Sequence, residues 1–149
     1  MTTVYLDACC LNRPFDDQSQ PRIRLEAEAV LIILERIQKA EWAWTSSTVL
    51  DLEIDQTPDA ERRARMNLLT QAAQRHVQVE AIQETRARDL VALGLAAMDA
   101  LHLACAESSG ADVFLTTDDR LLRIAARLSE QLRVRVMNPL NFVEETTAK

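Results

Sequence analysis

The sequence predicts a three-layer α/β/α fold, in which helices cover both faces of a central parallel sheet. Short apolar segments alternate with longer helical ones along the chain, which is the pattern of a parallel sheet. With 149 residues and 48% hydrophobic content, the chain fits one domain over residues 1–149 and can bury most of its apolar surface. No repeat, low-complexity tract or linker interrupts it.

The first quarter of the chain predicts a strand, a loop and a long helix. Thr3 to Leu6 is a short buried strand, and a polar loop runs from Asn12 to Pro21. Pro21 suits the first turn of a helix because its fixed φ is already helical. Apolar residues then recur at helical spacing, which predicts an amphipathic helix. Its apolar stripe comprises Ile23, Ala27, Val30, Leu34 and Ile37, and the charged residues off that stripe are Glu26, Glu28, Glu35 and Arg36.

Predicted strands and helices also alternate in the middle of the chain. Glu41 to Thr45 is the second predicted strand, and the helix after it carries Glu53. Three hydroxyl residues can cap that helix by accepting a backbone N–H: Ser46, Ser47 and Thr48. Pro58 with Asp59 begins a helix that runs to about Gln74, and Val77 to Val79 is a short strand candidate.

The last part of the chain completes the alternation. Helices are predicted over Glu84–Leu93, from the Asp99 turn to Ser109, and over Asp118–Ser129, with strands at Asp112–Leu115 and Val134–Val136. Gly110 ends the second of these helices, and Asn138-Pro139 breaks whatever follows. The first and fourth strands, which bear Asp7 and Asp118 at their ends, are expected to be central neighbours in the sheet.

The charge balance is acidic, with a formal net charge of −6. This weakens a simple nucleic-acid interpretation, because proteins that bind the phosphate backbone usually present a basic surface. Part of the negative charge belongs to a candidate metal site, where bound cations would offset it. The basic residues are fifteen arginines and only Lys39 and Lys149. Arginine binds phosphate in bidentate fashion, although a high-GC coding bias gives the same enrichment.

Several functional classes are excluded by what the sequence lacks. Its only glycines, Gly94 and Gly110, rule out a Gly-rich phosphate loop, and the scarcity of lysine argues against chemistry built on a catalytic Lys. No apolar run approaches a membrane span and no signal peptide is present, which predicts a cytoplasmic protein. The three cysteines lack zinc-type spacing and are expected to be buried reduced thiols. They are Cys9, Cys10 and Cys105.

Four carboxylates fall where a parallel sheet would gather them. Asp7 ends the first strand segment, Asp118 follows the fourth, and Glu53 and Asp99 lie near the starts of helices. In open α/β sheets the crevice outside the carboxyl ends of the strands is the usual ligand site. Acids that converge there repel one another unless a cation neutralises them. Oxygen ligands select a hard divalent ion, so Mg²⁺ or Mn²⁺ is expected.

Each acid also has a structural interpretation. An Asp at a strand end, such as Asp7, is often a helix cap. Asp99 can act as a charge on the helix dipole, but a carboxylate in an apolar helix needs a partner, a metal or a proton. His102 shares a helix face with Asp99 and can orient a carboxylate or a water. Such a histidine is more often a satisfied core residue.

Two of the acids have acidic neighbours in sequence. Glu53 lies between Asp51 and Asp55, and only one of the three can point where Asp7 points; Glu53 borders the apolar face most closely. Asp118 is followed by Asp119. One of this pair is expected to be a ligand or a supporting acid, and the other a charge at a helix start.

These residues resemble the PIN-domain nucleases, and particularly the VapC-type toxins of bacterial toxin–antitoxin pairs. The matching segments span nearly the whole chain in the expected order, and the last two are the most specific. They are Val4–Asp7 with Asn12–Phe15, Ser47–Glu53, Gly94–Ala106 (GLAAMDALHLACA) and Gly110–Leu122 (GADVFLTTDDRLL).

The resemblance implies a metal-dependent endoribonuclease with Mg²⁺, or Mn²⁺ in its place. Its acidic catalytic positions correspond to Asp7, Glu53, Asp99 and Asp118, with Asp7, Asp99 and Asp118 as metal ligands and Thr116 as a supporting hydroxyl. The family commonly has an acid two positions beyond Asp118, where this chain has Arg120; Asp119 can substitute, or a second metal binds weakly. A small antitoxin partner and a homodimer are also implied.

Two other functions are consistent with parts of the sequence. A PIN-like module that binds RNA or protein without cleaving is favoured by Arg120 in place of an acid. A haloacid-dehalogenase-type phosphatase also has an Asp after its first strand. However, that chemistry requires a second Asp two residues later, where this chain has Cys9, and a well-placed Lys, which neither lysine provides.

Overall fold

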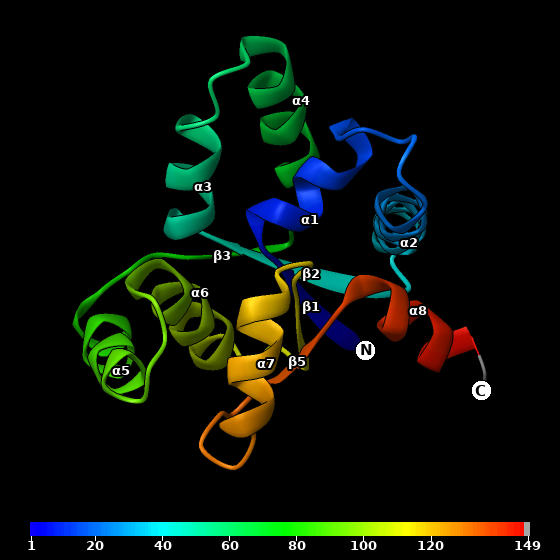
Figure 1. The fold of residues 1–149 in the computed structure, drawn as a ribbon. Coiled ribbons are helices and arrows are strands. Elements are labelled where there is room, and N and C mark those ends of the chain that lie inside the picture. The colour runs from blue at the N-terminus through cyan, green and yellow to red at the C-terminus, as the bar shows by residue number, and fades with distance from the viewer. Residues whose placement is uncertain (148–149) are drawn as a thin grey trace.

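The computed structural model of the chain describes residues 1–147 and contains a five-stranded, all-parallel sheet with helices on both faces (Figure 1). The strands are β1 (Thr2–Leu6), β2 (Trp42–Ser47), β3 (Arg75–Val77), β4 (Val113–Leu115) and β5 (Arg135–Met137). Their order is β3-β2-β1-β4-β5, so β1 is central. Tyr5 is in register with Thr45 on one side and with Phe114 on the other. The predicted α/β class and the pairing of the first and fourth strands are confirmed.

Several of the helices begin at a residue whose side chain caps them. They are α1 (Ala8–Asn12), a 3-10 turn η1 (Arg13–Phe15), α2 (Pro21–Gln38), α3 (Thr48–Asp55), α4 (Ala60–Thr70), α5 (Ala81–Ala92), α6 (Ala97–Ser108), α7 (Asp119–Arg127) and α8 (Pro139–Thr147). Of the three hydroxyls that can cap α3, Ser47 does so by accepting from the Leu50 N–H at 3.1 Å. Asp59 caps α4 and Asp118 caps α7 in the same way.

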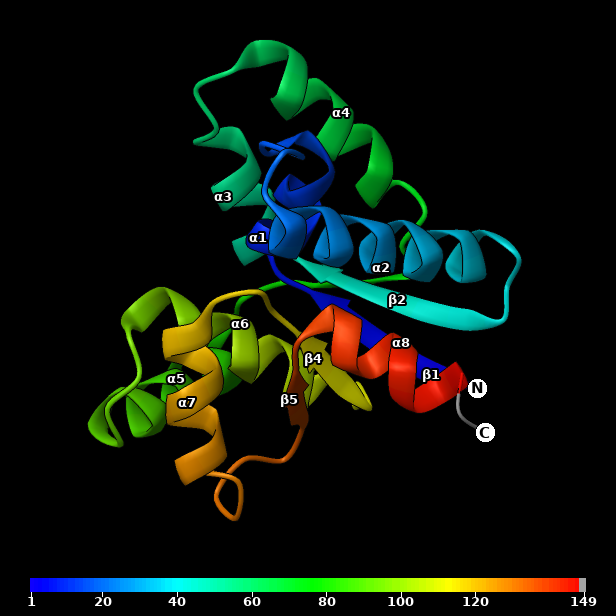
Figure 2. The same ribbon diagram turned by 45° about the vertical axis from the view of Figure 1, so that its right-hand side comes forward.

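Two apolar layers hold the helices to the sheet. Side chains alternate across a strand, so Val4 and Leu6 face α2, α3 and α8, whereas Tyr5 faces α5, α6 and α7 with Phe114. Figure 2 shows α2 and α8 on one side of the sheet and the α5–α7 group on the other. Over residues 1–147, none of the helices has both the length and the apolar character that crossing a membrane requires.

The structure differs from the expected elements at short segments. The expected polar loop after residue 12 contains η1, and α1 precedes it, because a five-residue helix carries too little periodicity to detect. Asn138-Pro139 begins α8 instead of breaking the chain: Pro139 is the first helical residue, and Asn138 Oδ1 accepts from the Leu140 N–H at 2.8 Å.

Helix α5 begins before Glu84, since Glu80 and Gln83 form a capping box. The third strand ends at Val77 rather than beginning there, and α4 ends at Thr70, four residues before the expected Gln74. The boundaries that differ between the sequence prediction and the structure are therefore those of short elements and of helix ends. Gly110 ends α6 as expected, with a positive φ of 73°.

The amphipathic helix departs from expectation at Glu26. This residue lies off the apolar stripe in sequence, yet its side chain is buried in the structure, with a relative exposure of 1%. It accepts hydrogen bonds from Arg13 Nε at 2.8 Å and Asn138 Nδ2 at 2.5 Å, and Arg22 Nε lies 3.3 Å away. These partners come from η1, α2 and the β5–α8 junction, which explains why helical periodicity did not reveal the burial.

Candidate functional site

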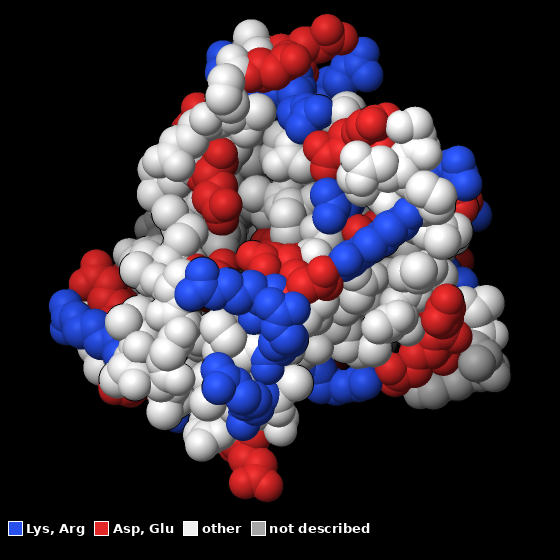
Figure 3. Space-filling model, viewed as in Figure 1, with Lys and Arg blue, Asp and Glu red and all other residues white. Residues whose placement is uncertain are grey.

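The four candidate acids lie at the carboxyl edge of the sheet. Asp7 directly follows β1, Asp118 follows β4 after two threonines, and α3 carries Glu53 just beyond β2. Asp99 lies in the first turn of α6. In Figure 3 acidic side chains gather near the middle of the face, between the positions of α1 and α7, with basic side chains on several sides. The fold therefore forms the edge at which the sequence predicted a ligand site.

Asp99 has the least satisfied carboxylate of the four. It is half-buried, and it makes no hydrogen bond or ion pair with any residue in the range 1–147. Its burial raises the pKa of the carboxyl above the usual value and the charge of Asp118 raises it further, whereas His102 lowers it and Glu53 adds a smaller increase. Asp99 thus shares one electrostatic environment with two other acids. Within residues 1–147, the ligand atoms that lie close enough together to share one ion are those of Asp7, Cys9 and Cys10, all within 4.8 Å of one another, so the four acids do not form one preformed metal site.

Asp7 is buried and combines two roles. Its Oδ1 accepts from the Cys10 N–H at 3.2 Å, which caps α1, so the structural interpretation of Asp7 as a cap holds. The same oxygen accepts from Cys9 Sγ at 2.7 Å. Burial raises the pKa of the Asp7 carboxyl well above its usual value. A carboxylate placed in so dry a position without a basic residue beside it is a second reason to expect a cation here.

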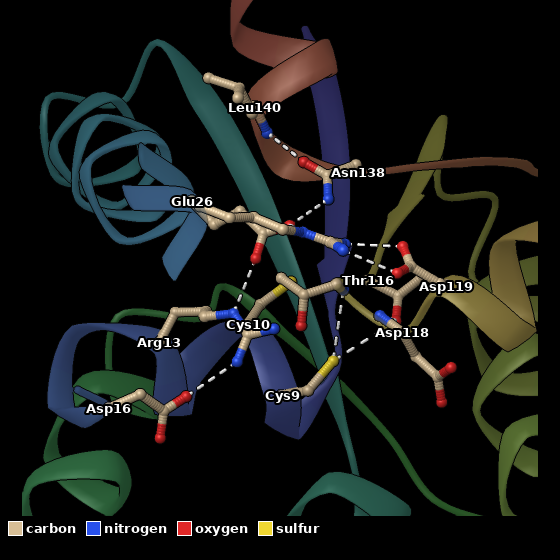
Figure 4. A network of polar contacts seen from close by, with 12 residues as sticks. Cys9, Cys10, Arg13, Asp16, Glu26, Thr116, Asp118, Asp119, Asn138 and Leu140 are labelled. Carbon is tan, nitrogen blue, oxygen red and sulfur yellow. Dashed lines mark hydrogen bonds and ion pairs between the residues drawn. The ribbon is translucent and has the colours of Figure 1, made fainter. Parts of the chain in front are cut away.

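Thr116 connects Asp7 to Asp118. Its buried hydroxyl accepts from the Asp118 N–H at 3.1 Å and lies 3.4 Å from Cys9 Sγ (Figure 4). Asp118 itself is exposed, and its Oδ1 accepts from the Arg120 N–H at 2.9 Å. Thr116 therefore fixes the backbone that presents Asp118.

Asp119 does not lie with the other acids. Arg22 binds it with both guanidinium nitrogens, at 2.6 and 2.7 Å, and the pair is about half-exposed (Figure 4). Arg120 is exposed on the first turn of α7. The acid two positions beyond Asp118 is thus absent, and Asp119 is held by an arginine from α2 instead of replacing it.

Glu53 is separated from its acidic neighbours by its contacts. Asp51 pairs with His76 at 2.7 Å, and Asp55 is exposed at the end of α3. Glu53 is half-buried and is hydrogen-bonded to His102 Nε2. Of the three, Glu53 is the one that turns toward the α6 side of the site. Both interpretations of His102 hold, since it is a buried core residue that also orients a carboxylate.

A buried hydrogen-bonded chain lies behind Glu53. The Tyr5 hydroxyl is 2.6 Å from His102 Nδ1 and 2.6 Å from Ser47 Oγ. Burial raises the pKa of Tyr5 well above its usual value, so the phenol keeps its proton. Because Ser47 Oγ already accepts from the Leu50 N–H, its own proton can go to Tyr5. Tyr5 then donates to His102 Nδ1, and His102 donates from Nε2 to Glu53.

Replacing Tyr5 with phenylalanine tests this chain. We expect the variant to lose about 1–3 kcal/mol of stability, because the buried Ser47 hydroxyl and His102 Nδ1 lose a partner. The ring itself still packs on Phe114, whose centroid is 5.2 Å away. Urea unfolding measures the loss. Thr45→Val is the control: within residues 1–147 the Thr45 hydroxyl is buried without a hydrogen-bond partner, so its removal should cost nothing. An unchanged Tyr5→Phe midpoint would contradict the chain.

The sequence interpretation missed three residues of this region. Cys9 was grouped with the buried thiols, but it is only partly buried and contacts Asp7 and Thr116, whereas Cys10 and Cys105 are buried as expected. Its position two residues after Asp7 was the available signal. Tyr5 and Ser47 were classed as a strand residue and a candidate cap, and only the pairing of β1 with β2 brings them together.

A hollow of about 370 Å³ adjoins the site on the α1 side. Its lining includes Cys9, Asn12 and Arg62, together with residues of the α3–α4 connection. Arg62 donates to Asn12 Oδ1, Asp16 Oδ1 and the Phe15 carbonyl, which holds α4 against η1. Most of the side chains that line the hollow are polar or charged, and none of the four candidate acids is among them.

The fold and the acidic edge of the sheet together indicate a class of protein. Comparison with known families identifies that class. A family model described as PIN domain matches residues 4–127. The chain therefore belongs to the PIN-domain family, a family of nucleases. The matched range contains all four candidate acids.

Solved structures show the same fold at low sequence identity. FitAcB from Neisseria gonorrhoeae is 15% identical, with a TM-score of 0.59 over 91% of this chain and 97% of that one. VapBC2 from Rickettsia felis, solved bound to a DNA fragment from the promoter, is 13% identical, with a TM-score of 0.59 over 92% and 98%. No curated protein matches the chain.

Proposed function

We propose that the protein is a metal-dependent endoribonuclease and the toxin of a toxin–antitoxin pair. The observation that supports this best is Asp99, a half-buried carboxylate without a hydrogen bond or ion pair, within the electrostatic reach of Asp118 and Glu53. A bound cation or a proton stabilises a carboxylate in that state. Membership of the PIN-domain family makes phosphodiester cleavage the chemistry to test first.

In this proposal Asp7, Asp99 and Asp118 hold Mg²⁺, with Mn²⁺ able to replace it. A divalent ion bound there would lower the pKa of a coordinated water and polarise the scissile phosphate. Side chains of the protein supply the proton acceptor and hold the site in place. Glu53, held by His102, accepts the proton of the attacking water, and Thr116 keeps the Asp118 backbone in place.

The partner of the proposed toxin is a small antitoxin protein. The VapC-type sequence segments and the two structural relatives, FitAcB and VapBC2, support this assignment. Acidic groups at the carboxyl edge would attract a basic segment of the antitoxin for the same electrostatic reason that they would attract a metal cation. A homodimer of this chain is part of the same proposal, as is activity in the cytoplasm.

Cleavage of a structured RNA pool by purified, partner-free protein tests the nuclease. We expect cuts with Mg²⁺ or Mn²⁺ and none with EDTA, and the Asp7→Asn variant should be inactive. Asparagine can still cap α1, so the variant should remain folded by circular dichroism. If folded wild-type protein cuts no RNA with either metal, the function as a non-cleaving binding module, favoured by Arg120 in place of an acid, replaces the nuclease.

A further inference from the structure

Helix α7 carries a row of three exposed arginines. Arg120, Arg123 and Arg127 are all exposed, and none makes a hydrogen bond or ion pair within residues 1–147. Most arginines of the chain bind a carboxylate or a backbone carbonyl, as Arg22, Arg62 and Arg86 do. In a protein with a net charge of −6, three unpaired cations on one short helix form a distinct local surface. We refer to Arg120, Arg123 and Arg127 as the α7 arginine face.

The spacing places the three side chains together. Positions i, i+3 and i+7 lie on the same side of a helix, and the opposite side of α7 buries Leu121 and Ala125. The three guanidinium groups therefore extend along the helix axis rather than around it. In Figure 3 the basic side chains run down from the central acidic patch, over the position of α7 in Figure 1.

The arginine face borders a hollow between α7 and Gly94. The hollow has a volume of about 630 Å³ and is lined by Gly94 and by α7, including all three arginines. In sequence, both of its walls lie next to candidate acids. Asp118 caps α7 at one end, and Asp99 lies five residues beyond Gly94, in the first turn of α6. The bound Arg22 is the main cause of the lowered pKa of Asp119, and the charge of Arg123 adds a smaller contribution.

We infer that the α7 arginine face binds the sugar–phosphate backbone of the RNA strand next to the scissile phosphate. The inference rests on the proposed function. It identifies the path that the bound RNA strand follows away from the acidic edge. A strand whose phosphate lies among four acids needs compensating cations close by, and guanidinium groups bind phosphate in bidentate fashion. The metal neutralises the acids, and the arginines attract the flanking backbone.

The lining of the hollow favours a nucleic acid over a protein partner. Protein interfaces have cores depleted of charge and enriched in aromatic residues. Here the α7 side of the hollow contributes three guanidinium groups, and its apolar members are only Ile124 and Ala126. Contacts made mainly through phosphate are also independent of base sequence. The arginine face should therefore strengthen binding to many RNAs without choosing the cleavage sequence.

The test is a salt titration of RNA binding in which no cleavage can occur. The Asp99→Asn protein in EDTA is titrated with a fluorescent single-stranded RNA, with and without R120Q/R123Q/R127Q. Three lost phosphate contacts at about 0.7 each should reduce the slope of log K against log salt by about 2. The control is R24Q/R88Q/R133Q, which removes three exposed arginines that also lack ion pairs in the described part of the chain. It should change the slope by less than 1.

Three outcomes overturn the inference: an unchanged slope in the α7 variant, an equal change in the control, or stronger binding of an acidic peptide than of RNA. The last would make the face a protein-docking surface. Because binding is measured without metal, these results are independent of cleavage. Protein that cuts RNA with an unchanged slope would contradict only the arginine face. Protein that binds through the face but never cuts would contradict only the nuclease.

Discussion

The Asp99→Asn variant is expected to lose at least about 10³-fold in RNA cleavage while becoming more stable to heat without metal. Loss of a metal ligand removes charge stabilisation worth several kcal/mol of the barrier, and about 4 kcal/mol corresponds to that factor. The gain in stability has a separate cause. Asp99 has no hydrogen bond or ion pair to lose within residues 1–147, and the neutral amide no longer repels Asp118.

The pH dependence of this gain follows from the direction of the pKa shift. Burial and Asp118 raise the pKa of Asp99 in the folded protein above 3.8, so the folded state holds the proton more tightly than the unfolded state. The protonated form therefore favours folding at low pH, and that contribution is lost as the pH rises through the folded pKa. The stability advantage of Asp99→Asn should be largest at neutral pH and should shrink as the pH approaches 4.

Thermal unfolding in EDTA and in Mg²⁺, at neutral pH and near pH 4.5, measures both effects. Mg²⁺ should raise the melting temperature of the wild type, since a ligand that binds only the folded state stabilises it, and it should raise that of Asp99→Asn much less. Asp89→Asn, an exposed carboxylate on α5, is the control and should change neither cleavage nor melting by much. A melting temperature for Asp99→Asn below that of the wild type at neutral pH would contradict the repulsion argument.

The general position of the candidate site could be predicted from the sequence because it depends on strand ends. Asp7 and Asp118 each follow an apolar strand segment, and parallel strands bring their carboxyl ends to one edge. Predicting that Asp7 and Asp118 lie close together then required only that the first and fourth strands be neighbours in the sheet, as they are. Glu53 could be preferred over Asp51 and Asp55 because it borders the apolar face of α3, where His102 meets it.

The features that could not be predicted depend on contacts between distant segments. Helical periodicity assigns a charged residue to the polar face, and nothing in the α2 segment indicates that Glu26 has partners from η1 and from the β5–α8 junction. The contact of Asp119 with Arg22 joins residues 97 positions apart. Such ion pairs depend on side-chain directions that exist only after the helices have packed, so they leave no local signal in the sequence.

These contacts form a chain of alternating charges along the rim of the site. Its members, in order, are Arg62, Asp16, Arg13, Glu26, Arg22 and Asp119, with successive distances of 3.1, 3.0, 2.8, 3.3 and 2.6 Å. Three cations and three anions alternate, so the chain carries no net charge. It connects α4 through η1 and α2 to α7. Figure 4 labels four of its members, Asp16, Arg13, Glu26 and Asp119. Glu26 is its buried centre, and the two ends are more exposed.

Replacing Glu26 with alanine is expected to cost about 3–5 kcal/mol of stability, because removing one partner of a buried ion pair leaves the other uncompensated. At about 2–4 °C per kcal/mol for a chain of this size, the melting temperature should fall by roughly 10 °C. Glu28→Ala is the matched control, two residues away on α2 and exposed, and it should change stability by no more than about 0.5 kcal/mol. Equal melting temperatures for the two variants would contradict the buried role of Glu26.

A double-mutant cycle with Arg13 separates the ion pair from simple loss of packing. Arg13→Ala alone leaves Glu26 buried with Arg22 and Asn138 still in contact, so it should cost less than Glu26→Ala. If the charges act as a pair, the double variant should be more stable than the sum of the two single losses predicts, by about 0.5–3 kcal/mol. Additive losses would mean that Glu26 contributes through its methylene packing and its bond to Asn138, and that the alternating chain adds no stability of its own.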